Sequence, residues 1–261
     1  MRPDSKTIAV VLLHGACNMR CMFCITDNQV GTMTPDQYLR VLSLLERRGF
    51  NGIVLGGGEP FCWPHGVRGA AQAAKAAGLL VQVGTNGVAM ARHEALEDCV
   101  DRYVLPLDAM DPLIHNSMRP LPAVSGGHHR LILRRLEQLR QRRGAVTVST
   151  VISRANLDDV VPIGNYLADY VADGGRLHAW HLYRFIPAGR GGARNAAALS
   201  ISNGDYERIV SEVKAQYYPF TVFKRPDMRH SATVDFLWYE NNSLRVGSEY
   251  WASTGDACKK A

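Results

Sequence analysis

Three cysteines crowd into eight residues near the start of the chain. The segment reads CNMRCMFC, so Cys17, Cys21 and Cys24 are separated by three and then two residues. A short loop with this spacing brings three thiolates together, which indicates a metal ion or a cluster. A structural zinc site needs four ligands, whereas a cluster with one open iron needs three. We therefore predict an iron–sulfur cluster, and the alternative is a zinc-binding structural module with His14 as fourth ligand.

A second segment whose residues could bind a ligand reads GGGEP, from Gly56 to Pro60, and follows a short apolar stretch. Glycines allow backbone carbonyls to approach a ligand closely, and the Glu59 carboxylate can accept a hydrogen bond from an ammonium group. A tight turn after a strand is the alternative explanation. Five further polar candidates stand near the ends of later apolar stretches: Thr85-Asn86-Gly87, Asp108, His115, Arg119 and Ser149.

The elements that position these residues alternate along the chain. Residues 7–13 form an apolar run that predicts a buried strand ending just before the cysteines. Thr34-Pro35 is typical of a helix start. Further strands are expected over 52–55, 79–83, 102–107, 146–152 and 178–186, with helices over about 67–77, 92–99, 129–143 and 157–170. This alternation predicts a parallel sheet with right-handed crossovers and ligand sites at the carboxyl ends of its strands.

The regular alternation of strands and helices ends at Pro187. A loop rich in Gly and Arg is expected over 188–195, then a helix over about 205–215 and short strands over 220–223, 233–238 and 244–246, with a hairpin turn at Asn241-Asn242. The fold class is therefore α/β. We expect a partial (βα)6 parallel barrel over residues 1–187, and a short α+β extension over residues 188–261 that caps it within the same domain.

The composition of the chain indicates which ligands and partners to expect. The chain has 261 residues and a net charge of +6, which suits small anionic ligands better than a dedicated nucleic-acid surface. It has neither an apolar run near the ~20 residues of a membrane span nor the apolar region of a signal peptide at its start. We expect a cytoplasmic protein with reduced thiols, without nucleic-acid or membrane partners. Cys62 and Cys99 are expected to be small buried hydrophobic residues.

The cysteine loop after a first strand, with Phe23 before the third cysteine and GGEP after the second strand, resembles the radical S-adenosylmethionine (SAM) superfamily. The resemblance extends from Thr7 to Pro187. It implies a [4Fe–4S] cluster whose open iron is chelated by the amino and carboxylate groups of SAM. It further implies reductive cleavage of SAM to methionine and a 5′-deoxyadenosyl radical, which abstracts hydrogen from substrate. The implied enzyme is of oxidoreductase or lyase type, and its one-electron donor is a flavodoxin or ferredoxin.

The resemblance also implies roles for single residues. The three cysteines hold the cluster, while Gly57, Gly58 and Glu59 hold the amino group of SAM. Asp108 occupies the place of a ribose acceptor, Arg119 that of an arginine facing the SAM carboxylate, and Ser149 that of a SAM contact. A solvated loop explains Arg119 almost equally well. The extension contains only one cysteine, Cys258, so the resemblance is to single-cluster members without an auxiliary cluster.

The subfamily is less defined. Residues 146–156 (VTVSTVISRAN) resemble viperin-like members, but Thr26-Asp27 and Thr147 stand where those carry lysines; molybdopterin- and haem-pathway members share the same pattern. Arg184, Arg190 and Arg194 suit a phosphate or carboxylate, or form a solvated loop. We expect a small anionic substrate (nucleotide, sugar or cofactor precursor) held by Arg190 or Arg194, on a loop whose glycines allow it to move. A radical SAM enzyme that modifies a peptide or protein is the alternative.

Overall fold

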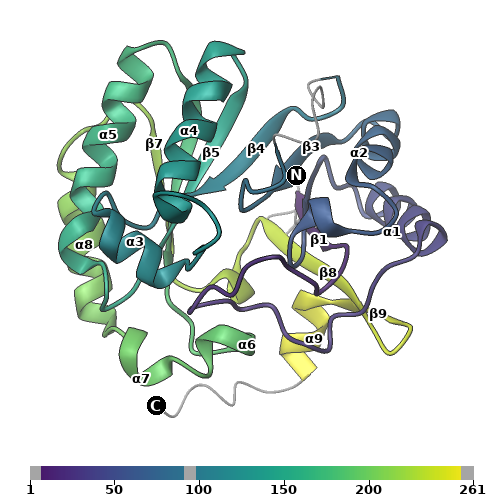
Figure 1. The fold of residues 1–261 in the computed structure, drawn as a ribbon. Coiled ribbons are helices and arrows are strands. Elements are labelled where there is room, and N and C mark those ends of the chain that lie inside the picture. The colour runs from purple at the N-terminus through teal and green to yellow at the C-terminus, as the bar shows by residue number, and fades with distance from the viewer. Residues whose placement is uncertain (1–6, 91–97, 254–261) are drawn as a thin grey trace.

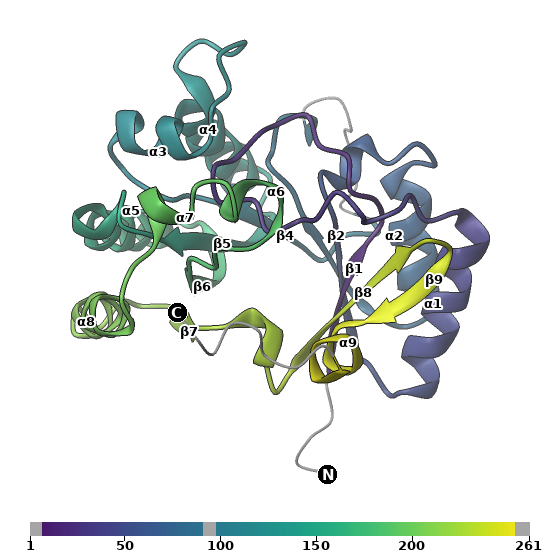
Figure 2. The same cartoon turned by 90° about the horizontal axis from the view of Figure 1, so that it is seen from below.

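The computed structural model describes residues 7–90 and 98–253. Its centre is one nine-stranded sheet with the order β7-β6-β5-β4-β3-β2-β1-β8-β9 (Figure 1). The strands follow an arc that is not closed, and helices α1, α2, α4, α5 and α8 lie on its outer side (Figure 2). This confirms the predicted α/β class and the partial barrel.

The six predicted barrel strands are all present and pair in parallel. They are β1 (Ile8–Leu12), β2 (Gly52–Gly56), β3 (Leu80–Gly84), β4 (Arg102–Pro106), β5 (Ala145–Ile152) and β6 (Arg176–Arg184). Buried apolar side chains of these strands pack against the outer helices and form the main core. The carboxyl ends of all six strands therefore meet at one edge of the sheet, where the cysteine loop begins.

The outer helices follow the predicted pattern. They are α1 (Pro35–Arg47), α2 (Val67–Ala76), α4 (Gly127–Gln141), α5 (Val160–Ala172) and α8 (Asn203–Lys214). Helix α1 begins with a capping box, because Thr34 Oγ1 accepts from Gln37 N and Gln37 Oε1 accepts from Thr34 N. The helix expected over 92–99 falls mostly outside the described residues. Within them, no helix has the length and apolar character that crossing a bilayer demands.

The extension contributes more to the sheet than its sequence pattern indicates. Strand β7 (Thr221–Arg225) pairs in parallel with β6, and β8 (Val234–Glu240) pairs in parallel with β1. Strand β9 (Ser243–Val246) then forms the expected hairpin with β8, through Asn241 and Asn242 at φ values of 49° and 60°. The extension thus lengthens the barrel sheet at both edges.

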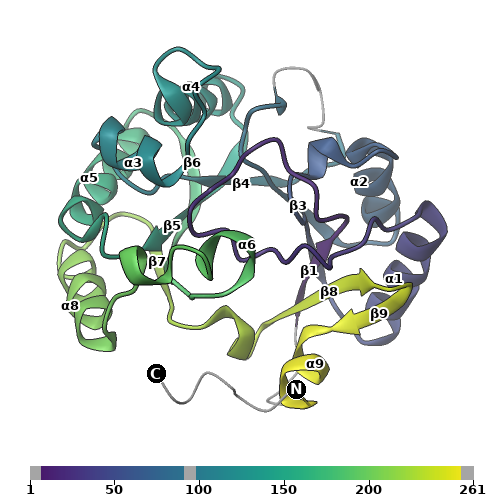
Figure 3. The same cartoon turned by 60° about the horizontal axis from the view of Figure 1, so that its bottom comes forward.

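Among the described residues, four further short α-helices were not predicted: α3 (Pro112–Met118), α6 (Gly189–Gly192), α7 (Ala196–Leu199) and α9 (Gly247–Ser253). Helix α6 occupies the region expected to be a loop, and α7 directly follows that region. Helix α6 lies next to the cysteine loop (Figure 3). Helix α9 places Trp251 against Phe236 and Trp238, with ring centroids 5.7 and 6.0 Å apart. The aromatic tail therefore covers part of β8.

Candidate functional site

The cysteine loop leaves β1 and crosses the carboxyl edge of the sheet. Each of the three thiols is partly exposed, and two receive N–H groups from other elements. Asn86 Nδ2 lies 3.6 Å from Cys17 Sγ, and Arg119 Nη1 lies 3.5 Å from Cys21 Sγ. The backbone N of Met19 also donates to Cys17 Sγ, at 3.4 Å. Such donors stabilise a sulfur that carries negative charge, as a metal-bound thiolate does.

Burial disfavours free thiolates in this loop. It raises the pKa of Cys17 to about 11 and also raises the pKa of Cys21, which Arg119 opposes. In the free loop, Cys17 and Cys21 therefore hold their protons at neutral pH, and a bound metal has to displace those protons. Uptake of iron by this loop is accordingly expected to release protons.

The donor set can be compared with a single ion and with a cluster. In residues 7–90 and 98–253, no three His, Cys, Asp or Glu side chains are arranged to hold one ion, whose ligands must lie about 2.0–2.3 Å away. His14 does not join the cysteines in such an arrangement, and its Nε2 donates to the Glu59 carbonyl at 2.8 Å. Three partly exposed thiols on one loop, with no fourth ligand arranged beside them among the described residues, fit an iron–sulfur cluster better than structural zinc.

The GGGEP segment holds the cysteine loop through backbone contacts. Gly58 N donates to His14 O at 2.7 Å, and Glu59 N donates to Ala16 O at 2.9 Å. A Cβ on Gly58 would lie 1.9 Å from Ala16 O, and Gly57 has a φ of 131°. The glycines thus permit close approach to the cysteine loop itself, in addition to the ligand role predicted for them.

The Glu59 carboxylate is fully buried and joins two strand ends. It accepts hydrogen bonds from Thr85 Oγ1 and Asn86 N, both at 2.7 Å, and from Phe61 N at 3.3 Å. Burial raises the pKa of Glu59, and these donors oppose the rise. Its contact with SAM remains a prediction. The Thr85-Asn86-Gly87 turn is now seen to link Glu59 with Cys17, through the Asn86 side chain.

Asp108 and Arg119 form a buried ion pair beside the cysteine loop. Asp108 is fully buried and also accepts from Val151 N at 2.8 Å. The Arg119 guanidinium lies 4.6 Å from the Phe23 ring centroid and reaches Cys21 Sγ. The structure therefore places Asp108 and Arg119 beside the cysteine loop. Their roles toward SAM remain predictions.

Two buried histidines connect this ion pair with the Asn86 turn. Asp108 N donates to His115 Nδ1 at 3.2 Å, so His115 Nε2 carries the proton and donates to His128 Nδ1 at 2.8 Å. His128 Nε2 then donates to Asn86 O at 2.8 Å. The chain of donors sets both tautomers. The sequence did not predict this pair, because the two rings meet only when α3 and α4 pack together.

The Gly- and Arg-rich segment packs tightly onto the cysteine loop. The N–H groups of Gly191 and Gly192 donate to Cys24 O at 3.0 and 3.2 Å. A Cβ on Gly191 would lie 2.4 Å from Cys21 O. The Arg190 guanidinium donates to Gly15 O at 2.6 Å. These glycines allow close contact, so the expectation of a moving loop in which Arg190 holds substrate does not match this geometry.

The remaining predicted residues lie apart from the cysteine loop. Ser149 is half-buried on the inner face of β5, and its SAM contact remains a prediction. Arg184 bonds to Asn203 and to Pro226 O, whereas Arg194 is exposed. The three arginines of this region therefore do not form one anion site. Cys99 is buried as expected, but Cys62 is exposed, so its prediction as a buried hydrophobe was wrong.

Comparisons with known proteins agree with this geometry. The family model of the radical SAM superfamily matches residues 11–167. The crystal structure of Streptococcus suis SuiB bound to S-adenosylmethionine is similar, with a TM-score of 0.68, 10% identity, and coverage of 90% of this chain and 58% of that one. Native anSMEcpe with bound AdoMet and Kp18Cys peptide gives a TM-score of 0.62 at 14% identity, covering 83% of this chain and 63% of that one.

The likeness to these solved structures concerns the fold, and the chain spans less than two thirds of their length. A search of curated proteins gave no match. The family model covers more than half of the chain and includes the cysteine loop, the GGGEP segment and Arg119. This chain belongs to the radical SAM superfamily.

Proposed function

We propose that Cys17, Cys21 and Cys24 hold a [4Fe–4S] cluster and that SAM binds beside it, at the carboxyl edge of β1 to β5. The observation that carries this proposal is the convergence on one loop of the GGGEP backbone, Asn86 and Arg119. When bound, the reduced cluster would supply one electron for the cleavage of SAM, which yields a 5′-deoxyadenosyl radical that abstracts a hydrogen atom from substrate.

The residues of the chain have separate tasks in this proposal. Arg119 and Asn86 donate to cysteine sulfurs and fix the loop, while Gly57, Gly58 and Glu59 present the SAM amino-group site. Asp108, Arg119 and Ser149 are proposed to contact the rest of SAM. A flavodoxin or ferredoxin is the proposed electron donor. Because β7 and β8 pair with β6 and β1, we propose that residues 1–187 and 188–261 form one domain.

We propose a small anionic molecule as substrate. A peptide is the second candidate, since one similar structure is SuiB bound to precursor peptide SuiA, and anSMEcpe carries a Kp18Cys peptide. The net charge of +6 supports the anionic candidate. Substrate-dependent stimulation of SAM cleavage distinguishes the two candidates.

Anaerobic reconstitution followed by reduction tests the proposal. We expect ~4 irons and sulfides per chain, and slow formation of 5′-deoxyadenosine and methionine after dithionite is added. Cys21→Ala should abolish both, whereas Cys99→Ala, at a buried cysteine outside the loop, should retain them. Colourless protein with one tightly bound zinc and no iron would contradict the proposal.

A further inference from the structure

The inner face of β6 and β7 presents a group of polar and aromatic side chains. Trp180 and Leu182 on β6 are fully buried in the outer core. Because side chains alternate along a strand, His181 and Tyr183 point to the opposite, inner face. On β7, Phe223 shares that face, since its ring meets the His181 ring at a centroid distance of 5.1 Å. Arg225 follows two residues later on the same side.

Strand register places Arg225 near the level of the cysteine loop. Arg225 pairs with Tyr183, and Tyr183 pairs with Val151. Val151 N donates to Asp108, which is ion-paired to Arg119 beside Cys21. Three strand spacings of about 4.8 Å separate β7 from β4, so Arg225 lies roughly 14 Å across the sheet from the Asp108 strand. SAM and a small substrate together can span such a distance.

The Arg225 side chain is held in a defined position. Its guanidinium carbon lies 4.9 Å from the Phe223 ring centroid, and its backbone N donates to Tyr206 Oη at 2.9 Å. Tyr206 in turn donates to Leu182 O at 2.7 Å and is fully buried. Tyr183 Oη and His181 Nδ1 lie 3.2 Å apart on the neighbouring strand. The backbone and the ring beneath Arg225 are therefore fixed before any ligand arrives.

The charge of Arg225 is not neutralised within the described part of the chain. In residues 7–90 and 98–253, its guanidinium has no carboxylate partner and no hydrogen bond to another group. Other arginines of this region are used internally, since Arg119 binds Asp108, Arg184 binds Asn203 and Arg190 binds Gly15 O. A half-buried guanidinium with free N–H groups can donate two parallel hydrogen bonds to a phosphate or carboxylate.

The neighbouring histidine does not add to this charge. Burial, and next the positive charge of Arg225, lower the pKa of His181 to about 3, so its ring is neutral at physiological pH. His181 and Tyr183 thus offer neutral hydrogen-bonding groups next to one cation. This part of the inner sheet face combines one cation with aromatic and neutral polar side chains. Such a surface suits a ligand that has an anionic group and an apolar or polar remainder.

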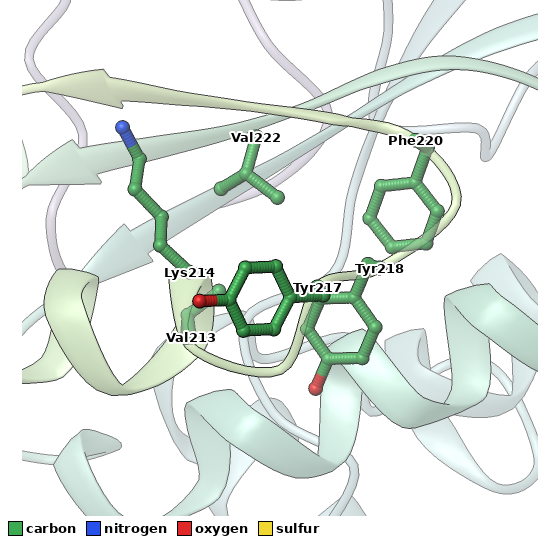
Figure 4. Close-up of a pocket in the computed structure, with 6 residues that line it drawn as sticks. All are labelled: Val213, Lys214, Tyr217, Tyr218, Phe220 and Val222. Carbon is green, nitrogen blue, oxygen red and sulfur yellow. The ribbon is translucent and has the colours of Figure 1, made fainter.

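A hollow of about 270 Å³ lies on the other side of β7 (Figure 4). Its lining includes Val222, whose side chain alternates with that of Phe223, and Tyr217 and Tyr218 after α8. It opens away from the inner face and contains one cation, Lys214. It therefore does not face the cysteine loop, and Arg225 is the better anchor for a substrate of this enzyme.

We propose that Arg225, supported by Phe223 and flanked by Tyr183 and His181, binds the phosphate or carboxylate of a small-molecule substrate on the inner face of β6 and β7. The inference rests on the proposed function for the identity of the ligand as substrate. It replaces Arg190 and Arg194 as the anion-binding groups expected from sequence, because Arg190 is bonded to Gly15 O.

Site-specific NMR on the reconstituted full chain tests this inference. The side-chain Nε–Hε signal of Arg225, assigned with Arg225→Lys, is followed during titration with inorganic phosphate and, separately, with malonate. We expect a saturable shift of this signal with at least one of the two anions. The affinities of wild type and variants are compared through the His181 ring signals, which remain when Arg225 is replaced. Arg225→Ala should weaken the affinity fitted from these signals about 10-fold or more, since it removes charge-assisted hydrogen bonds, and Phe223→Leu should weaken it less. Shifts for one anion alone identify phosphate or carboxylate as the preferred group.

Arg208→Ala is the matched control, because Arg208 is exposed on α8 and paired with Glu212. It should leave both affinities unchanged. An Arg225 signal that does not respond, or that responds no more than the Arg208 signal, overturns the inference. So does equal anion affinity of wild type and Arg225→Ala. Iron content and SAM cleavage are measured on the same wild-type preparation, so a failure of the proposed function is recognised separately.

Discussion

His115 and His128 form a direct hydrogen bond between two buried imidazole rings, with Nε2 and Nδ1 2.8 Å apart and the rings stacked at 12°. This bond joins α3 to α4 and continues to Asp108 N and Asn86 O. Asn86 also contacts Cys17 Sγ, and Asp108 is paired with Arg119, which contacts Cys21 Sγ. The pair therefore connects the turns after β3 and β4 without any charged group of its own.

The histidine pair should make stability depend on pH. Burial, and next the charge of Arg119, lower the pKa of His115 to about 2 and of His128 to about 3. Both rings are neutral when folded, but in the unfolded chain they take up protons below their ordinary pKa of about 6.5. Stability is therefore complete above pH ~6.5 and declines toward pH 3, by ~1.4 kcal/mol per pH unit for each ring.

His128→Gln tests this dependence, because the amide can still accept from His115 and donate to Asn86. Denaturant unfolding between pH 7.5 and 4.5, with cluster absorbance monitored, should show a slope smaller by about one proton. His65→Gln, at an exposed histidine, is the control and should keep the wild-type slope. An unchanged slope in His128→Gln would show that His128 is already charged in the folded protein.

Glu59→Gln should weaken SAM binding while iron content is retained. Both carboxylate oxygens of Glu59 accept hydrogen bonds, whereas an amide offers only one acceptor oxygen. The loss is expected to cost ~1–3 kcal/mol, equivalent to roughly 5- to 150-fold in affinity if it falls on SAM binding. Equilibrium dialysis with SAM measures it. Glu137→Gln on exposed α4 is the matched control, and normal SAM affinity in Glu59→Gln would remove Glu59 from the SAM site.

Arg119→Met should be more harmful than the double variant Arg119→Met with Asp108→Asn. The single change leaves the fully buried Asp108 carboxylate without its cation, at ~3–5 kcal/mol of unfolding free energy. The second change removes the unpaired charge, so stability should recover by ~1 kcal/mol or more. Urea unfolding measures both. Simple additivity of the two single variants would mean that the pair is not coupled.

Gly191→Ala should impair the cysteine loop. The added Cβ would lie 2.4 Å from Cys21 O and 2.7 Å from Cys24 N, so the loop or α6 must shift. We expect a loss of ~1–3 kcal/mol in stability and lower iron content after reconstitution. Gly69→Ala is the control, because nothing lies within 4 Å of its Cβ and it should stabilise α2 by ~0.5–1 kcal/mol. Full iron content in Gly191→Ala would argue against tight packing here.

Arg190→Ala and Arg194→Ala should differ although the residues are four apart. Arg190 donates to Gly15 O on the cysteine loop, and Arg194 is exposed. Loss of a charged donor should destabilise the chain by ~1.5–3 kcal/mol for Arg190, against ~0.5 kcal/mol or less for Arg194. Thermal unfolding and iron retention during gel filtration measure the difference. Equal behaviour of the two variants would restore the solvated-loop interpretation of both.

The sequence by itself determined the close spacing of three cysteines, the GGGEP turn and the six alternating strands, because spacing and hydrophobic periodicity are local properties. It did not determine that β7 and β8 extend the sheet at opposite edges, since strand pairing depends on contacts between residues distant along the chain. The same reason applies to the histidine pair, which forms only when α3 and α4 pack together.

The glycines of α6 illustrate the difference most clearly. From sequence, a run of glycines near arginines is typical of a mobile loop that binds anions. The tertiary structure instead places Gly189 and Gly191 against backbone atoms of the cysteine loop, where a Cβ would lie 2.2 and 2.4 Å from Ile25 O and Cys21 O. Glycine permits either motion or close contact, and only the atoms that surround it in the folded chain decide between them.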